Sequence, residues 1–320
     1  MILSWGRLFV NIFYYLCTMQ SNTNVLAHIT AFTVAMIWGS TFISTKVLIL
    51  NGLSPVQIFT LRFIIAYVLL LLLTFYLGRH DKRKFSWFAD NWKDEAIMIA
   101  LGITGGSAYF YTENEALRFG TATNVSLIVC ACPLFTALLY RMMVKNVRLS
   151  KRLIVGSILA FVGMVVVVLN GHFVLHLSPL GDSLAFAACL CWAFYSILIN
   201  YVTDRYNSAF ITRKVFFYGL LTILPYYRFF PDFPTWQELM QPAIVGNLLF
   251  LSVVASLVCF VAWNWSLHLL GAIRVTNYVY VNPVSTIVFA AWILHEPITI
   301  YFIVGTILIL YGMYLSYRKE

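Results

Sequence analysis

Long apolar stretches recur along the whole chain and are separated by short polar segments. A helix needs about 20 mostly apolar residues to cross the hydrocarbon core of a bilayer. The pattern predicts ten transmembrane helices, at residues 27–49, 55–77, 95–117, 121–143, 152–170, 180–202, 209–229, 243–267, 272–294 and 299–317. The longest connections, 78–94 and 230–242, leave no room for a sizeable soluble domain. The predicted fold class is an all-α polytopic membrane protein.

Composition supports the same class. The 320 residues are 61% hydrophobic and only 10% charged, whereas soluble domains are about a quarter charged. So few charges could not cover a water-facing surface of this size.

The first 26 residues precede the predicted helices. Arg7 is followed by an apolar stretch that is too short to span a bilayer, and no A-x-A-like cleavage site follows it. We interpret residues 1–26 as an N-terminal extension that begins with a non-native part, with Met19 as the candidate native start. An amphipathic anchor at the membrane surface is the alternative.

The positive charges follow the predicted topology. With the N-terminus inside, all but four of the 21 Lys and Arg residues lie in cytoplasmic segments or at cytoplasmic helix mouths. Only Arg118 and Arg228 fall outside, and Lys46 and Arg62 lie within spans. Cytoplasmic loops are enriched in Lys and Arg, so both termini are expected in the cytoplasm. This distribution explains the net charge of +9 without nucleic acid.

The chain contains an internal repeat. Four landmarks recur at offsets of 149–151 residues, and Trp38 matches Trp192 further upstream. The landmark pairs are Gly120 and Gly271, Pro133 and Pro283, Gly156 and Gly305, and Gly163 and Gly312. We predict a first five-helix repeat at 27–170, a linker at 171–180, a second repeat at 181–317 and a cytoplasmic tail at 318–320. Because five is odd, the second repeat enters the membrane upside down, as in many secondary transporters.

Several stretches resemble one family. "IWGSTFISTKVLILNGLSPVQIFTLRF" (37–63), "EALRFGTATNVSLIVCACPLFTALL" (115–139), its second copy "WSLHLLGAIRVTNYVYVNPVSTIVF" (265–289) and "HEPITIYFIVGTILILYGM" (295–313) resemble EamA-type ten-helix permeases of the drug/metabolite transporter superfamily. The resemblance implies export or exchange of small metabolites or amino acids across a bacterial inner membrane. It does not name the substrate.

Three ionisable residues within the spans are candidates for the transport path. Helical rise places Lys46, Arg62 and Glu113 in the outer third of the first repeat. Gly102 and Gly106 lie on the same stripe as Glu113 and form GxxxG, which lets another helix approach closely. We predict a Lys46–Glu113 pair, with Arg62 nearby, that closes the outer gate or lines the path. A static ion pair or snorkelling to the surface is the alternative.

Two prolines mark matching positions of the two repeats. Pro133 and Pro283 each lie near the middle of a predicted helix and free the carbonyl groups of Val129 and Val279. Interrupted helices at matching positions point to a transport site, and a simple packing kink is the alternative.

Polar and aromatic residues cluster on the predicted interior faces. Amides and aromatic rings suit a neutral, zwitterionic or partly apolar solute. Each of them could instead serve packing or hydrogen bonding between helices. The candidates are Trp38, Tyr109, Asn124, Trp192, Ser196, Trp263, Asn264, Asn277, Tyr280 and Asn282.

Motifs of other function classes are missing from the sequence. No HExxH, Walker A, GxSxG or GxGxxG occurs, and His172 and His176 lack a third metal ligand. We therefore predict no metal, no cofactor, no nucleic acid and no enzymatic activity. An intramembrane enzyme and a structural or sensory membrane protein are the weaker alternatives.

The predicted function is a secondary transporter or facilitator of small organic solutes, working by alternating access. Amino acids or related metabolites are the first choice, moved outward, and Glu113 is the candidate for any proton coupling. The runner-up is an uptake permease for a vitamin-like or sugar-like compound. The expected partners are the solute and the lipid bilayer, and a monomer and a homodimer both remain open.

Overall fold

The computed structural model describes residues 24–80, 86–120, 122–143, 150–169, 178–230, 232–285, 288 and 299–317. Most of the predicted N-terminal extension, including Met19, lies outside these residues. So do most of the linker, with His172 and His176, and the tail 318–320.

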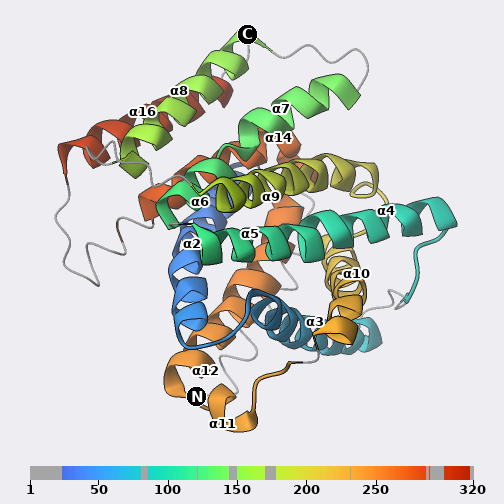
Figure 1. Ribbon diagram of the computed structural model, residues 1–320. Coiled ribbons are helices and arrows are strands. Elements are labelled where there is room, and N and C mark those ends of the chain that lie inside the picture. The colour runs from blue at the N-terminus through green and yellow to red at the C-terminus, as the bar shows by residue number, and fades with distance from the viewer. Residues whose placement is uncertain are drawn as a thin grey trace, which may run out of the picture.

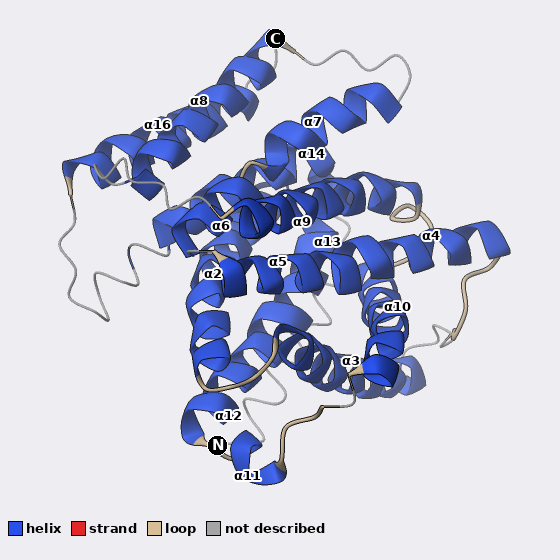
Figure 2. Ribbon diagram, viewed as in Figure 1, coloured by secondary structure: helices blue, strands red, loops and turns tan. Residues whose placement is uncertain are grey.

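All regular structure in the described residues is helical (Figure 2). The first repeat contains α2 (Asn24–Leu50), α3 (Pro55–His80), α4 (Trp92–Gly102), η1 (Ile103–Ser107), α5 (Ala108–Phe119), α6 (Ala122–Val129), α7 (Cys132–Met143) and α8 (Lys151–Leu169). The second contains α9 (Pro179–Leu198), η2 (Ile199–Tyr201), α10 (Ser208–Phe229), α11 (Trp236–Leu239), α12 (Pro242–Leu249), η3 (Phe250–Val258), α13 (Cys259–Leu270), α14 (Ala272–Thr276), η4 (Asn277–Val281) and α16 (Ile300–Tyr317). Each predicted transmembrane segment coincides with helix over most of its described residues.

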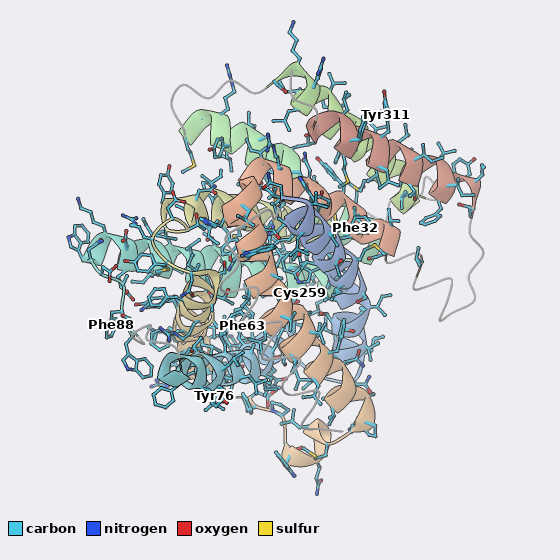
Figure 3. The ribbon with its side chains drawn as sticks, turned by 180° about the vertical axis from the view of Figure 1, so that it is seen from behind. Phe32, Phe63, Tyr76, Phe88, Cys259 and Tyr311 are labelled. Carbon is cyan, nitrogen blue, oxygen red and sulfur yellow. The ribbon has the colours of Figure 1, made fainter. Side chains whose placement is uncertain are left out.

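Several of these helical segments are long and apolar enough to cross a bilayer by themselves. Within the described residues, five qualify: Asn24–Leu50, Pro55–Tyr76, Val125–Met143, Pro179–Tyr201 and Pro242–Leu270. Apolar side chains cover the outside of the molecule as well as its core. In Figure 3, Phe32 and Tyr311 lie at the periphery, while Phe63 and Cys259 lie in the interior and are fully buried. The chain is therefore an all-α polytopic membrane protein.

The two repeats share their irregularities. The third predicted span of each repeat contains a π-helical segment, η1 in the first and η3 in the second. The fourth span is interrupted in both: α6 ends at Val129 just before Pro133, and 3-10 segment η4 ends at Val281 just before Pro283. The predicted repeat and both interrupted helices are confirmed, and the fold is two inverted five-helix repeats.

Glycines bring helices of the two repeats together. A Cβ atom on Gly163 would lie 2.7 Å from the carbonyl oxygen of Gly305, which lets α8 and α16 run side by side away from the other helices (Figure 1). A Cβ atom on Gly106 would lie 3.1 Å from the Cα atom of Gly219 in α10. The close approach predicted for the Gly102 and Gly106 stripe is therefore confirmed, and its partner is a helix of the other repeat.

Polar residues fix where several helices begin. Asn91 accepts a hydrogen bond from the Asp94 amide at the start of α4, and Asn207 accepts one from the Phe210 amide at the start of α10. Such caps satisfy amides that the first helical turn leaves without an intrahelical partner. The two capped ends lie on the same side of the molecule and carry the charged cluster described below.

Candidate functional site

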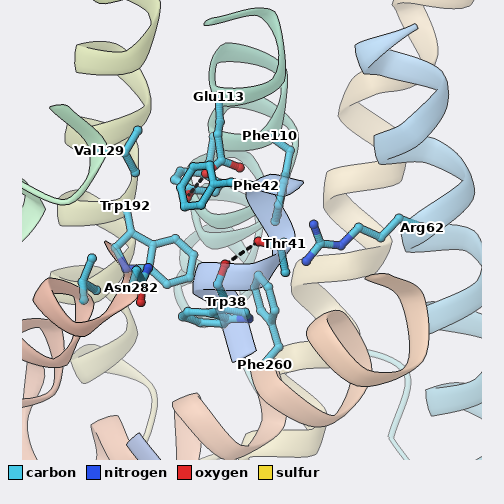
Figure 4. A pocket seen from close by; sticks show the side chains of 12 residues that line it. Trp38, Thr41, Phe42, Arg62, Phe110, Glu113, Val129, Trp192, Phe260 and Asn282 are labelled. Atoms are coloured by element: carbon cyan, nitrogen blue, oxygen red, sulfur yellow. Dashed lines mark hydrogen bonds between the residues drawn. The ribbon is translucent and has the colours of Figure 1, made fainter. Parts of the chain in front are cut away.

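A cavity of about 470 Å³, including its mouth, lies between the two repeats. Figure 4 shows side chains converging on it from helices far apart in the sequence. The first repeat contributes Trp38, Thr41, Phe42, Arg62, Tyr109, Phe110, Glu113 and Val129, and the second contributes Trp192, Phe260, Val279 and Asn282. Six of the candidates from the sequence are in this set: Trp38, Arg62, Tyr109, Glu113, Trp192 and Asn282.

Trp38 is the centre of an aromatic wall. Its ring centroid lies 5.2 Å from that of Trp192 and 4.8 Å from that of Trp263, and its Nε1 atom donates to the Ala255 carbonyl at 2.9 Å. Trp38 and Trp192, the matched pair of the repeat, therefore meet at the boundary between the halves. The neighbouring Gly39 brings α2 close to a different segment of the second repeat, because a Cβ atom there would lie 3.0 Å from the carbonyl carbon of Asn282.

Arg62 brings a positive charge to the cavity from α3. Its side chain is 4% exposed, its Nε atom donates to the Ser256 hydroxyl at 2.5 Å, and its Cζ atom lies 4.6 Å from the centroid of the Phe110 ring. Ser256 belongs to π-helical segment η3, so an irregular turn of the second repeat holds a cation of the first.

Glu113 brings a negative charge to the same cavity from α5. It is 9% exposed, and its Oε1 atom accepts a hydrogen bond from the Tyr109 hydroxyl at 2.7 Å. The Tyr109 ring in turn lies 5.0 Å from the Trp192 ring, centroid to centroid. The acid is thus oriented from its own helix and braced against the second repeat.

The predicted Lys46–Glu113 pair is wrong. Lys46 does not line the cavity, and its Nζ atom donates to the Leu117 carbonyl at 3.0 Å. Leu117 lies in the last turn of α5, where carbonyl oxygens lack intrahelical partners and attract cations. Lys46 therefore holds the end of that helix, while Glu113 shares the cavity with Arg62.

Ser196 and Asn264 serve hydrogen bonding between and within helices, the alternative stated for them above. The Ser196 hydroxyl donates to the Trp192 carbonyl at 2.8 Å. Asn264 accepts from the Tyr195 hydroxyl at 2.6 Å and donates to the Thr212 hydroxyl at 2.9 Å. These buried contacts fix the helices behind the aromatic wall.

Three other candidates are buried near the cavity without lining it. Trp263 packs on Trp38, and Tyr280 is fully buried; Trp263 Nε1 and the Tyr280 hydroxyl have no hydrogen-bond partner within the described part of the chain. Asn277 accepts from the Ser157 hydroxyl at 3.4 Å. Asn124 lies in α6, and its side chain is not among those described.

The residues four positions before the two prolines line the cavity. Pro133 and Pro283 are not in the lining, but Val129 and Val279 are, one from each repeat. The interrupted helices thus border the cavity from both halves, as proline pairs at matching positions indicate.

The sequence interpretation missed Thr41, Phe42, Phe110 and Phe260. The first two follow Trp38 by three and four positions, and Phe110 precedes Glu113 by three, so helical spacing from the chosen candidates could have found them. Phe260 has no such signal before the fold is known.

A second charged cluster joins the repeats at the N-terminal ends of α4 and α10. Lys214 forms an ion pair with Glu95, and Tyr218 donates to the same carboxylate oxygen. The other oxygen accepts from the Ala89 amide at 2.6 Å, and Arg205 pairs with Asp94 at 2.6 Å. We call the Glu95–Lys214–Tyr218 cluster the polar clamp. It lies 18 residues before Glu113 on the same span, which is about 27 Å along a helix.

An inverted pair of five-helix repeats around a central, partly charged cavity is the architecture of a secondary transporter. Comparisons with known proteins agree. The model of the EamA-like transporter family matches residues 25–169 and again 179–318. The chain belongs to this family.

Two of the curated relatives match over nearly their whole length. A protein of Archaeoglobus fulgidus, named an uncharacterized transporter, is 28% identical over 94% of this chain and 99% of its own. A probable amino-acid metabolite efflux pump of Escherichia coli (strain K12) is 23% identical over 89% of this chain and 93% of its own. One crystal structure superposes with a TM-score of 0.70 at 17% identity, covering 91% of this chain and 97% of the other, which bears on the fold alone.

The family, the fold and the cavity together define the class. The chain is an integral membrane protein and a transporter of small solutes, and the predictions of family and fold class are confirmed. Its relatives carry the names of transporters and efflux pumps, not of enzymes.

Proposed function

We propose that this protein is a secondary transporter or facilitator that moves amino acids or related metabolites out of the cell by alternating access. The observation that carries the proposal is the cavity between the repeats, to which Arg62 and Glu113 bring opposite charges and Trp38 and Trp192 bring aromatic faces. Opposite charges beside apolar rings suit a small zwitterion with an uncharged portion. The probable amino-acid metabolite efflux pump among the relatives supports the same solute class and direction.

Alternating access is supported by the separation of the cavity from the polar clamp. The clamp joins α4 of the first repeat to α10 of the second, at the end of the bundle away from Glu113. Transporters with inverted repeats rock one part against another around a fixed site, so a contact of this kind has to open during the cycle. The charge distribution supports a bacterial inner-membrane protein with both termini, and with them the polar clamp, on the cytoplasmic side.

The test is solute flux into and out of liposomes that hold the purified protein. A panel of labelled L-amino acids and related metabolites is offered with and without a proton gradient, and protein-free liposomes give the background. We expect saturable flux of amino acids or their derivatives that exceeds the background. Flux confined to sugar-like or vitamin-like compounds would refute the proposed solute class. If the folded protein transports no compound of a broad panel, transport itself would be refuted.

A further inference from the structure

Arg62 is a buried cation with no carboxylate in ion-pair contact among the described residues. Its bond to Ser256 uses one of the five N–H donors of a guanidinium group. The other contact is with the Phe110 ring, whose centroid lies 4.6 Å from Cζ, so N–H donors remain available for a further partner. In Figure 4 the end of the Arg62 side chain points into the cavity, toward Thr41.

A buried guanidinium without a carboxylate is costly, because it has lost its hydration. Two parallel hydrogen bonds from a guanidinium to a carboxylate offset that loss and are geometrically specific. Glu113 does not provide them, since its Oε1 atom is held by Tyr109 and no ion pair joins it to Arg62. The two charges instead face the cavity from different helices, α3 and α5, and each retains capacity for a charged partner.

We propose that Arg62 is the anchor for the carboxylate of the solute and Glu113 the anchor for its ammonium group. This assignment rests on the proposed function and narrows it to one substrate class, α-amino acids with an uncharged side chain. The remainder of the solute lies against Trp38, Trp192 and Phe260. No further Lys, Arg, Asp or Glu is among the described residues of the lining, so a second charge on the solute would find no counterpart.

The first test is direct binding to the purified protein by titration calorimetry, which needs no flux. Leucine, serine and phenylalanine are each compared with their amide, which lacks the carboxylate, and with their deaminated acid, which lacks the ammonium group. We expect at least one amino acid to bind, and both of its analogues to bind at least about tenfold more weakly. An amide that binds as tightly as its amino acid, or an absence of binding by all three amino acids, would overturn the assignment.

Variants of Arg62 then test whether this residue causes the tighter binding of the amino acid than of its amide. In Arg62→Gln the ratio of amide to amino-acid dissociation constants should fall toward one, while Arg62→Lys should keep part of the ratio. Arg118→Gln is the matched control, because Arg118 is 59% exposed and pairs with Glu115 away from the cavity, and its ratio should match the wild type. A wild-type ratio in Arg62→Gln would contradict the proposal. If Arg62→Gln does not fold, the Arg62→Lys ratio decides.

Binding and flux separate this assignment from the proposed function. Discrimination by the carboxylate without any flux would support the anchor and refute transport of these solutes. Flux of amino acids and their amides with equal affinity would support transport and refute the anchor.

Discussion

Replacing one charged residue of the polar clamp should lower the free energy of unfolding by an amount that depends on how deeply the ion pair is buried. Lys214 is 3% exposed and Glu95 is 18% exposed, and the Lys214 ammonium lies 4.8 Å from the centroid of Phe88 and 5.1 Å from that of Tyr218. Lys214→Met keeps the packing of the side-chain stem and removes the charge. Removing one partner of a buried ion pair leaves the other charge poorly solvated and costs about 3 kcal/mol.

Glu95→Gln removes the other charge and keeps the shape of the side chain. It should cost less than Lys214→Met, since the surrounding rings still favour the ammonium group. The double variant leaves no charge without its partner. It should therefore recover about 1–2 kcal/mol relative to the sum of the single effects.

The assay is the free energy of unfolding in mixed micelles, measured for the wild type, both single variants and the double variant. Lys93→Met is the control, because Lys93 is exposed beside the clamp and its loss should change the free energy by less than about 0.5 kcal/mol. Single effects that add without coupling would show that the two charges do not stabilise one another, and would remove the clamp from the account.

Three further predictions concern other parts of the chain. Gly39→Ala should lower the free energy of unfolding by about 1–3 kcal/mol, because its Cβ atom meets backbone of the other repeat, while Gly246→Ala, with nothing within 4 Å of the added atom, should not; equal effects would contradict the close approach. Lys46→Ala and Glu113→Ala should have additive effects on the free energy of unfolding, since Lys46 donates to a carbonyl group and not to Glu113; a coupling energy above about 0.5 kcal/mol would show that the two side chains do interact. At the start of α11 the Thr235 amide donates to the Oε2 atom of the exposed Glu238 carboxyl at 2.7 Å, and this N-cap contact holds the pKa of that carboxyl below its usual value. The stabilisation from the contact is therefore present at neutral pH and lost as the pH falls below about 4. Amide exchange in α11 should then rise, and exchange that is independent of pH after correction for the intrinsic rate would contradict the cap.

The helices and the repeat could be predicted because their signals are local. The length of each apolar stretch sets each span. Pro133 and Pro283 interrupt their helices because proline has no backbone N–H to donate to the carbonyl four residues earlier, whatever the rest of the fold does. The glycine stripe of the third span was equally readable, since GxxxG marks a close approach whichever helix supplies the partner.

The partner of Lys46 could not be predicted from the same evidence. Helical rise gives the depth of a residue, and Lys46 does lie near the end of α5, but depth does not say which atom of that end it meets. At that depth the Lys46 ammonium could contact either the Leu117 carbonyl of the last turn or the Glu113 carboxylate one turn earlier. The carbonyl is the one it contacts.

Phe260 and the polar clamp illustrate contacts that only the fold reveals. The chain has 26 phenylalanines, and nothing in the periodicity marks Phe260 as one that faces the cavity. Glu95 and Lys214 are 119 residues apart in different repeats, and each alone is an ordinary charge at a helix end. Their pairing depends on how the two repeats dock, which no pattern within one helix encodes.

The central claim, that the cavity between the repeats is the transport path, is tested most directly by blocking it. Thr41→Cys places a thiol on the cavity wall, and a bulky methanethiosulfonate reagent is added to liposomes that show amino-acid flux, with the wild type treated in parallel. The account predicts that modified Thr41→Cys loses flux, that excess solute slows the modification, and that the treated wild type keeps its flux. Full flux through the modified variant, with labelling confirmed by mass, would contradict it.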